Sequence, residues 1–168
     1  MPLTTRIATI ADRDRLYNLY CEAMTGYIEE IWGWDEIWQQ NDFEEAFKTC
    51  ATYVIESDSD FSGYYQLKFG EDTDRLQMLI LTPAMRSLGI GRQLLHRTST
   101  TSDEHGRRLL LRVFRINTAA KRFYENNGWA VIAEEAAFYL MENPSHSTPR
   151  APDTSFPRTI ESYAFVID

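Results

Sequence analysis

The beginning of the chain contains a strand-like segment followed by a helix-like segment. Thr4–Ile10 alternates enough between polar and apolar residues to predict a first strand at Arg6–Ile10. After Asp12, a plausible N-cap, apolar residues recur at helical spacing and predict a helix that ends near Gly26. These apolar residues are Leu16, Leu19, Tyr20 and Ala23.

The next segment is rich in tryptophan and precedes a predicted hairpin. We interpret residues 31–38 as a turn that enters a second helix, with Asn41 or Asp42 as the cap of its helical turns. Thr52–Glu56 is β-branched and aromatic, and Tyr64–Phe69 alternates, so the two segments predict paired strands. The residues between them are typical of a turn.

The second half of the chain predicts the remainder of a mixed α/β sheet. Leu76–Leu81 is a continuous apolar run, as expected of a strand that is buried on both faces. Helices are then predicted at 91–102 and 117–126, and strands at 109–114, 129–133 and 137–141. A meander of strands followed by this alternation predicts a mixed sheet with helices packed against it.

The composition changes after Met141. Four prolines interrupt a polar segment, which predicts an extended tail without a packed core. We therefore divide the chain into a domain over residues 1–142 and a proline-rich tail over residues 143–168. The tail ends in Tyr163–Ile167, whose strand character predicts packing against the sheet edge or a partner chain.

Acidic and basic residues are concentrated in different parts of this chain, whose net charge is -8. Residues 22–72 contain thirteen acids and two lysines, whereas residues 86–122 contain nine bases and two acids. This division suits two ligands of opposite charge. The net acidity argues against nucleic acid as the main partner, because phosphates require a cationic surface.

The sequence also restricts location and metal chemistry. No segment approaches the ~20 consecutive apolar residues of a transmembrane helix, and Met1–Ile10 does not resemble a signal peptide. Cys21 and Cys50 lack metal-ligand spacing and suit a reducing compartment. We therefore expect a cytoplasmic protein with no membrane partner. The histidines show no partner pattern, so we expect no metal site; they are His96, His105 and His146.

A glycine-containing loop follows the buried strand and precedes a predicted helix. Its sequence is Arg86-Ser87-Leu88-Gly89-Ile90-Gly91. The two glycines allow backbone N–H groups to converge on one point, and the helix adds its unpaired N–H groups and positive dipole end. Arg86 and Arg92 add countercharge. The third glycine of a dinucleotide fingerprint and the Gly-Lys-Ser/Thr of a P-loop are both missing. The loop therefore predicts a diphosphate site of another kind.

A second candidate site lies on the helix predicted at 117–126. Asn117 and Tyr124 are about two helical turns apart, so they share one face, and Ala120 between them leaves room for a ligand. A tyrosine hydroxyl in this position can donate a proton to a leaving group. The alternative is an interior aromatic residue with a hydrogen-bonded hydroxyl.

Together, these two segments resemble the GNAT superfamily of N-acetyltransferases. Its Gln/Arg-x-x-Gly-x-Gly/Ala cofactor motif is matched by Arg86, Gly89 and Gly91. Its later Asn…Ala…Phe/Leu-Tyr…Gly-Phe pattern is matched by Asn117, Ala120, Phe123, Tyr124, Gly128 and Trp129. The order of predicted elements from Arg6 to Met141 also fits, so the resemblance covers most of the chain.

The resemblance implies the GNAT acyl-CoA N-acyltransferase fold, with a mixed, mostly antiparallel central sheet flanked by helices. It implies acetyl-CoA as acyl donor, a pantetheine arm paired with the strand that ends at Leu81, and Tyr124 as the acid that protonates the departing thiolate. The implied cofactor-binding residues are Leu79, Ile80, Leu81, Arg86, Ser87, Leu88, Gly89, Ile90, Gly91, Arg92, Asn117, Ala120 and Tyr124.

Two features depart from the family pattern. Ser87 and Leu88 stand where the loop often carries glycine and arginine, so some backbone freedom and one charge are missing. Ile80 stands where many members place a glutamate as general base. The resemblance therefore leaves the route of acceptor deprotonation open.

The first two helices form the wall of the acceptor pocket in this fold, which directs attention to a segment rich in acids and aromatic residues. The substrate-binding candidates in it are Tyr27, Glu29, Glu30, Trp32 and Trp34. Acids beside tryptophans suit a cationic amine through ion pairing and cation–π contact. The alternative is that the tryptophans are packing anchors for a broken helix.

These observations predict direct transfer of an acetyl group from acetyl-CoA to the amine of a small molecule. Acetylation of a protein or peptide is a second hypothesis. A non-catalytic acyl-CoA-binding module is a third, because the glutamate is missing at Ile80. The sequence leaves the acceptor and the oligomeric state open, with a homodimer among the options.

Overall fold

The computed structural model describes residues 2–143 and 166–167. Two short 3₁₀ helices, η1 (Ile10–Asp12) and η2 (Pro83–Met85), lie between longer elements. The longer elements are β1 (Leu3–Ile7), α1 (Arg13–Ile31), α2 (Glu36–Thr49), β2 (Ala51–Ser57), β3 (Asp60–Lys68), β4 (Thr73–Leu81), α3 (Ile90–Glu104), β5 (Arg108–Phe114), α4 (Thr118–Asn126), β6 (Ala130–Glu134), β7 (Phe138–Glu142) and β8 (Val166–Ile167).

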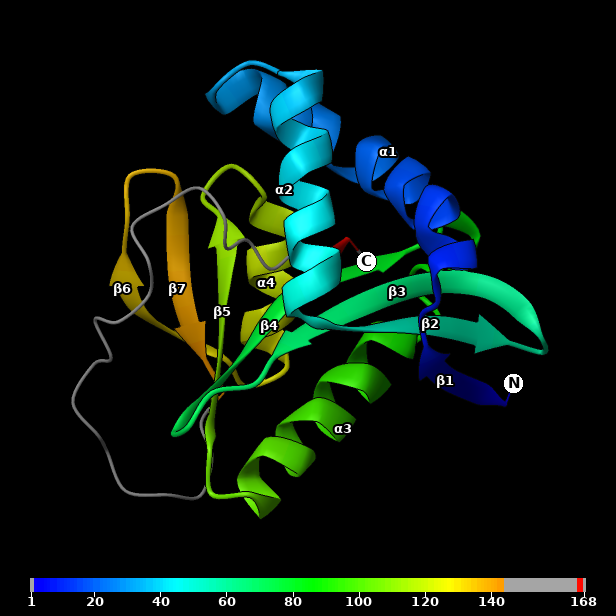
Figure 1. Ribbon diagram of the computed structural model, residues 1–168. Helices are drawn as coiled ribbons and strands as arrows, with labels where there is room; N and C mark the ends of the chain where they lie inside the picture. Colours follow the sequence, from blue (N-terminus) through cyan, green and yellow to red (C-terminus); the bar gives the residue numbers. More distant parts are fainter. Residues whose placement is uncertain (1, 144–165, 168) are drawn as a thin grey trace.

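The described strands form one sheet in the order β1-β2-β3-β4-β5-β7-β6, and β8 also pairs with β4 (Figure 1). Neighbouring strands are antiparallel except for the parallel pairs β4–β5 and β4–β8. The prediction of a mixed, mostly antiparallel sheet flanked by helices is confirmed. The predicted hairpin is β2–β3, and its turn places Asp58 and Ser59 at positive φ.

Both N-terminal helices are longer than the sequence pattern predicted. α1 passes through Gly26 and ends at Ile31, because a single exposed glycine costs only about 1 kcal/mol and Ile28 extends the buried face beyond it. α2 begins at Glu36 and not near Asn41, because the Asp35 side chain accepts a hydrogen bond from the Trp38 N–H at 2.9 Å and caps the helix there.

β1 ends at Ile7, before the predicted Ile10, because the chain turns into η1. The buried Asp12 carboxylate accepts hydrogen bonds from the Thr9 N–H and from both terminal nitrogens of Arg6, all at 2.8 Å. The Arg6 guanidinium holds the pKa of Asp12 well below its usual range. This charged turn joins the edge strand to the start of α1.

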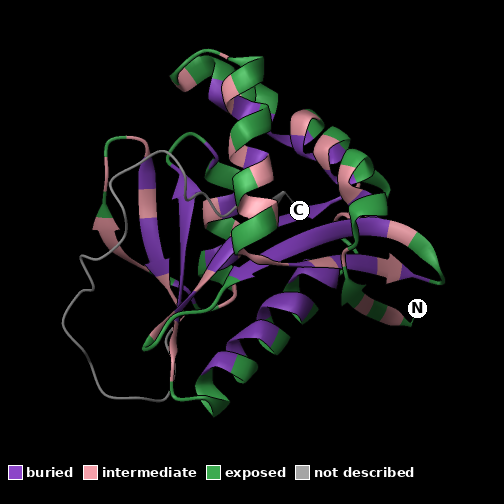
Figure 2. Ribbon diagram, in the orientation of Figure 1, coloured by how far each residue is buried: buried purple, intermediate pink, exposed green. Residues whose placement is uncertain are grey.

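Helices cover both faces of the sheet, and each face has its own apolar core (Figure 2). On one face, α1 and α2 pack against side chains that include Tyr64, Ile80 and Phe114. On the other face, α3 and α4 pack against side chains that include Leu79 and Leu81. Successive residues of β4 therefore serve opposite cores, as the continuous apolar run of this strand predicted.

A buried carboxylate, that of Asp74, joins β4, α3 and β5 where the β4–β5 pairing begins. Asp74 of β4 is fully buried and accepts hydrogen bonds from the Ser102 Oγ–H at 2.8 Å and the Arg107 Nε–H at 2.7 Å. Ser102 lies near the end of α3, and Arg107 directly precedes β5. These contacts hold β5 against β4 where the two strands begin to pair.

The described residues show neither a membrane span nor a metal cluster. None of their helices combines the length and the apolar character that crossing a bilayer requires. Among the same residues, no group of three or more His, Cys, Asp or Glu side chains is placed to hold a metal ion.

Candidate active site

β4 and β5 pair only over a short distance. The parallel ladder runs from Thr73 opposite Arg108 to Arg75 opposite Leu110, and beyond it the two strands diverge (Figure 1). From Leu76 to Leu81, the edge of β4 that faces away from β3 therefore borders a gap between β4 and β5, which β8 enters at Leu79 and Ile80. Backbone groups along such an edge can pair with another extended chain or with a ligand that carries amides.

The predicted diphosphate loop begins where β4 ends. Arg86 folds back and donates from Nε to the Leu81 carbonyl at 3.2 Å, which anchors the loop to the strand. Ser87 and Gly89 both adopt left-handed backbone conformations, with φ of 60° and 79°. Gly89 is the N-cap of α3 and provides no side-chain cap, so the first-turn N–H groups face the exposed loop. This arrangement can bind an anion.

Glycine is favoured at positions 89 and 91 of the loop for two different structural reasons. Gly89 has open space around it, and its positive φ is what favours glycine. Gly91 lies inside α3, where an added Cβ would come within 3.1 Å of the Phe123 ring of α4. The expectation that both glycines serve close backbone approach to a ligand is therefore incomplete, because Gly91 also permits α3 and α4 to pack together.

A cleft of about 560 Å³ extends from the first turn of α3 toward the α4–β6 turn. Arg92 lies at the α3 end of this cleft and is exposed. The other lining residues are Gln93, Leu95, His96, Ser99, Asn126, Asn127, Trp129 and Asn143. The cleft combines cationic, amide and aromatic groups, which suit a nucleotide.

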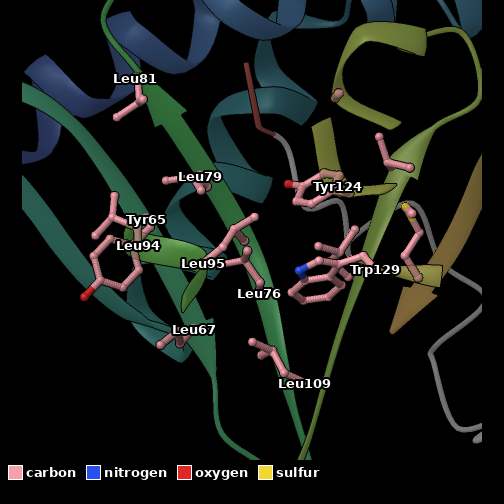
Figure 3. Close-up of a cluster of buried hydrophobic side chains, with 14 of the residues drawn as sticks. Tyr65, Leu67, Leu76, Leu79, Leu81, Leu94, Leu95, Leu109, Tyr124 and Trp129 are labelled. Carbon is pink, nitrogen blue, oxygen red and sulfur yellow. The ribbon is translucent and has the colours of Figure 1, made fainter. Parts of the chain in front are cut away.

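Tyr124 lies on α4 and is fully buried. Its ring packs edge-on against Phe123, with centroids 5.6 Å apart, and lies 5.7 Å from the Trp129 ring. Its hydroxyl points toward β4 near Leu79 (Figure 3). The ring is thus held by packing, while the hydroxyl is directed toward the part of β4 that borders the gap.

The sequence pattern placed Asn117 inside the helix, whereas the structure shows that Asn117 is the N-cap of α4. The Asn117 Oδ1 accepts from the Ala120 N–H at 3.1 Å and so starts α4. The Asn117 Nδ2 is buried and has no hydrogen-bond partner among the described residues. A buried donor without a partner costs about 1–3 kcal/mol, so a polar ligand group that reaches it would recover that energy.

On the opposite face, the end of α1 contributes aromatic residues above the sheet. The Tyr27 ring lies 6.0 Å from the Phe114 ring. Trp32 lies 5.6 Å from Phe114 and 5.9 Å from Phe138, and keeps 40% of its surface exposed. We call Tyr27, Trp32, Phe114 and Phe138 the aromatic cluster. It covers the end of β5 and the beginning of β7.

The remaining acceptor candidates divide into structural and exposed residues. The Glu29 carboxylate accepts from the Trp34 N–H at 2.8 Å, and Glu36 accepts from the Trp34 Nε1–H at the same distance. Glu36 also accepts from the Tyr17 hydroxyl at 2.7 Å, and these hydrogen bonds lower its pKa. Trp34 thus anchors the α1–α2 connection, whereas Glu30 is exposed on the last turn of α1.

Ile80 is fully buried on the same face as the aromatic cluster. Its cross-strand partner is Tyr64 of β3, whose hydroxyl is buried without a hydrogen-bond partner among the described residues. Burial raises the pKa of Tyr64 above its ordinary value, so this hydroxyl keeps its proton and cannot serve as a base at neutral pH. Neither residue therefore supplies the missing carboxylate.

A comparison with known protein families shows to which family the chain belongs. The sequence profile of the acetyltransferase (GNAT) domain matches residues 48–131, a region that contains the loop before α3 and Tyr124. The chain belongs to the GNAT acetyltransferase family. No curated protein matches the sequence.

Solved structures share the fold of this GNAT acetyltransferase. The PaiA N-acetyltransferase from Thermoplasma acidophilum, in complex with coenzyme A, is 20% identical, with a TM-score of 0.67 over 85% of this chain and 99% of that one. An acetyltransferase from Thermus thermophilus is 20% identical, with a TM-score of 0.65 over 84% and 96%. A GNAT acetyltransferase from Elizabethkingia anophelis with acetyl-CoA bound is 13% identical, with a TM-score of 0.62 over 83% and 95%.

Sequence reasoning missed several residues that the structure places at the candidate site. Phe114 and Phe138 complete the aromatic cluster, and their only signal was an aromatic residue at the end of a predicted strand. Tyr64 appeared as an ordinary strand residue, and its burial opposite Ile80 depends on the register of β3 and β4. The end of the tail was predicted to pack against the sheet edge or a partner chain, but Val166–Ile167 pairs with the interior strand β4, because strand character does not identify a partner.

Proposed function

We propose that this GNAT acetyltransferase transfers the acetyl group of acetyl-CoA directly to the amine of a small molecule. Family membership supports acetyl transfer from acetyl-CoA, and the proposal adds that the acceptor is a small-molecule amine. The observation that carries the proposal is the edge of β4 at Leu79–Leu81. This edge leads into the anion-binding loop and has the Tyr124 hydroxyl directed toward it (Figure 3).

The donor side fits an acyl-CoA in three parts. The backbone groups of Leu79–Leu81 suit the amides of pantetheine, and the buried Asn117 Nδ2 is a further donor near the start of α4. The first-turn N–H groups of α3 suit the diphosphate. Arg92 and the cleft beside it suit the nucleotide. Loop residues from Arg86 to Arg92, together with Ala120, complete the proposed donor site.

Tyr124 is proposed as the general acid. Acetyl-CoA supplies an acetyl group activated as a thioester, whose transfer leaves a thiolate. The Tyr124 hydroxyl carries a proton that can be donated to this sulfur, and packing fixes its ring. A general acid contributes most when its direction is fixed before the reaction, which the buried ring provides.

The opposite face supports a small cationic acceptor. The end of α1 covers the buried rings of Phe114 and Phe138 with Trp32, whose own ring stays partly exposed and suits cation–π contact. Glu30 is exposed on the last turn of α1 and can attract an ammonium group, whereas Glu29 and Glu36 are already used by the α1–α2 connection. We infer that this partly exposed aromatic group favours a small cationic molecule over an extended peptide.

Acceptor deprotonation is proposed to take place in solvent. Ile80 and Tyr64 cannot accept a proton, and the hydrogen bonds that lower the pKa of Glu36 also make it a weak base. The ammonium group of the acceptor therefore loses its proton before the amine attacks the thioester.

The test is release of free thiol from acetyl-CoA with a panel of small amines and short peptides with free N-termini. We expect release that depends on the presence of a small amine, and an acetylated product of the corresponding mass. Turnover with peptides alone would contradict the proposed acceptor class. Coenzyme A binding without turnover with any acceptor would indicate a non-catalytic binding module.

A further inference from the structure

β8 occupies the gap between β4 and β5. Val166–Ile167 pairs in parallel with β4, with Val166 opposite Leu79 and Ile167 opposite Ile80. The strand character predicted for Tyr163–Ile167 is therefore found at its end, and the other residues of that segment lie outside the described residues. The partner is an interior strand of the sheet at the place where β5 has diverged.

β8 also lies against the helix that carries Tyr124. α4 contacts β8 as well as β5, so β8 is placed between β4 and α4. Figure 3 shows the red segment of β8 beside β4, on the side from which the Tyr124 hydroxyl approaches. Tyr124 is fully buried in this arrangement. A thioester cannot reach its hydroxyl unless the surrounding chain moves.

The backbone groups on this edge of β4 can serve one partner at a time. The opposite edge already pairs with β3, where Tyr65 lies opposite Leu79 and Tyr64 opposite Ile80. A ladder hydrogen bond uses the N–H or C=O that points across the gap, so β8 and a pantetheine amide need the same atoms. Their occupancies of this edge therefore exclude each other.

We infer that β8 acts as an autoinhibitory strand, which competes with the acyl donor for the edge of β4 at Leu79 and Ile80. This inference rests on the proposed function, because it takes that edge as the donor site. β8 belongs to the same chain, which gives it a high local concentration. Coenzyme A binds at this edge only when its own pairing with Leu79 and Ile80 displaces that of Val166 and Ile167.

Competition of this kind lowers the apparent affinity for the donor. The apparent Kd equals the intrinsic Kd divided by the fraction of molecules in which the edge is open. A chain in which β8 is paired nine-tenths of the time would therefore bind coenzyme A about tenfold more weakly than one without the strand. Any partner that captures β8 would activate the enzyme.

The first experiment uses the unmodified full chain and follows amide hydrogen exchange with and without saturating coenzyme A. We expect the amides of Val166–Ile167 to exchange faster when coenzyme A is bound, because the strand is displaced, while Leu79 and Ile80 stay protected. Unchanged or increased protection of Val166–Ile167 would overturn the inference. This measurement requires no variant and so does not depend on the folding of one.

The second experiment compares coenzyme A affinity by calorimetry in the full chain and two double variants. Val166→Pro with Ile167→Pro removes both backbone donors, and we expect binding at least about threefold tighter. The matched control, Val166→Ala with Ile167→Ala, keeps both donors and should bind like the unmodified chain. Equal affinity in the three proteins would overturn the proposed competition but leave the donor site standing. Absence of coenzyme A binding in all three would overturn the donor site and, with it, this inference.

Discussion

The role of Tyr124 gives the sharpest test of the active site. Tyr124→Phe removes one oxygen atom and keeps the ring that packs against Phe123 and Trp129. Because the ring contacts remain, we expect the free energy of unfolding to change by no more than about 1.5 kcal/mol, the net value of a hydrogen bond. Loss of a general acid should lower kcat by roughly 10²- to 10⁴-fold. That range corresponds to about 3–5 kcal/mol in activation free energy.

The assay compares turnover, donor binding and stability in the same preparations. Thiol release gives kcat, calorimetry gives the Kd of coenzyme A, and urea unfolding gives stability. We expect the Kd to stay within about threefold of the unmodified value, because the hydroxyl acts on the leaving group and not on the ground state.

Tyr65→Phe is the matched control for this substitution. Tyr65 is buried on the same face of the sheet, but its ring stacks on Tyr53 at 4.8 Å, on the side of the sheet formed by β2 and β3. The Tyr65→Phe variant should keep kcat within a factor of about two of the unmodified value. The acid assignment is refuted if Tyr124→Phe also retains kcat within that factor, or if both variants lose activity equally.

Three further outcomes are expected. With two acceptor amines of different basicity, the rising limb of the pH–rate profile should move with the pKa of the amine; a limb common to both would show a base in the protein. Gly91→Ala should destabilise the fold in urea unfolding by up to about 2 kcal/mol, because the contact of its Cβ with the Phe123 ring outweighs the roughly 1 kcal/mol that alanine gains over glycine inside a helix, and adding Phe123→Leu should recover part of the loss. Because Arg6 holds the pKa of Asp12 below the ordinary 3.8, their pairing stabilises the fold above that pH and is lost as pH falls toward the lowered pKa. Asp12→Asn should therefore flatten the loss of stability below pH ~4; an unchanged slope would contradict this.

Element types could be predicted from periodicity, whereas the ends of elements depended on individual contacts. The apolar run at Leu76–Leu81 indicated a strand buried on both faces, and β4 is such a strand. The start of α2 was misplaced because Asp35 caps the helix inside a segment that tryptophan and glycine made turn-like. The end of α1 was misplaced because tertiary packing of Ile28 outweighs the weak helix preference of Gly26.

The candidate site divides in the same way between local and long-range information. The loop before α3 and Tyr124 could be found because each lies in a short local pattern. The environment of Gly91 depends on Phe123 from another helix, and that of Ile80 depends on the register with Tyr64. No local pattern encodes such contacts. The domain division at residue 142 stays a prediction, because most of the tail lies outside the described residues.

The short ladder between β4 and β5 has a consequence for the folding of this domain. β2, β3 and β4 are joined by short turns, so their pairing brings together residues that are near in sequence. The β4–β5 junction, in contrast, joins two strands that η2 and α3 separate in the sequence, and the Asp74–Arg107 contact holds it. Contacts between distant residues carry a larger entropic cost and form later. We therefore expect the sheet to assemble as two cooperative units, with the junction that borders the active site completed last.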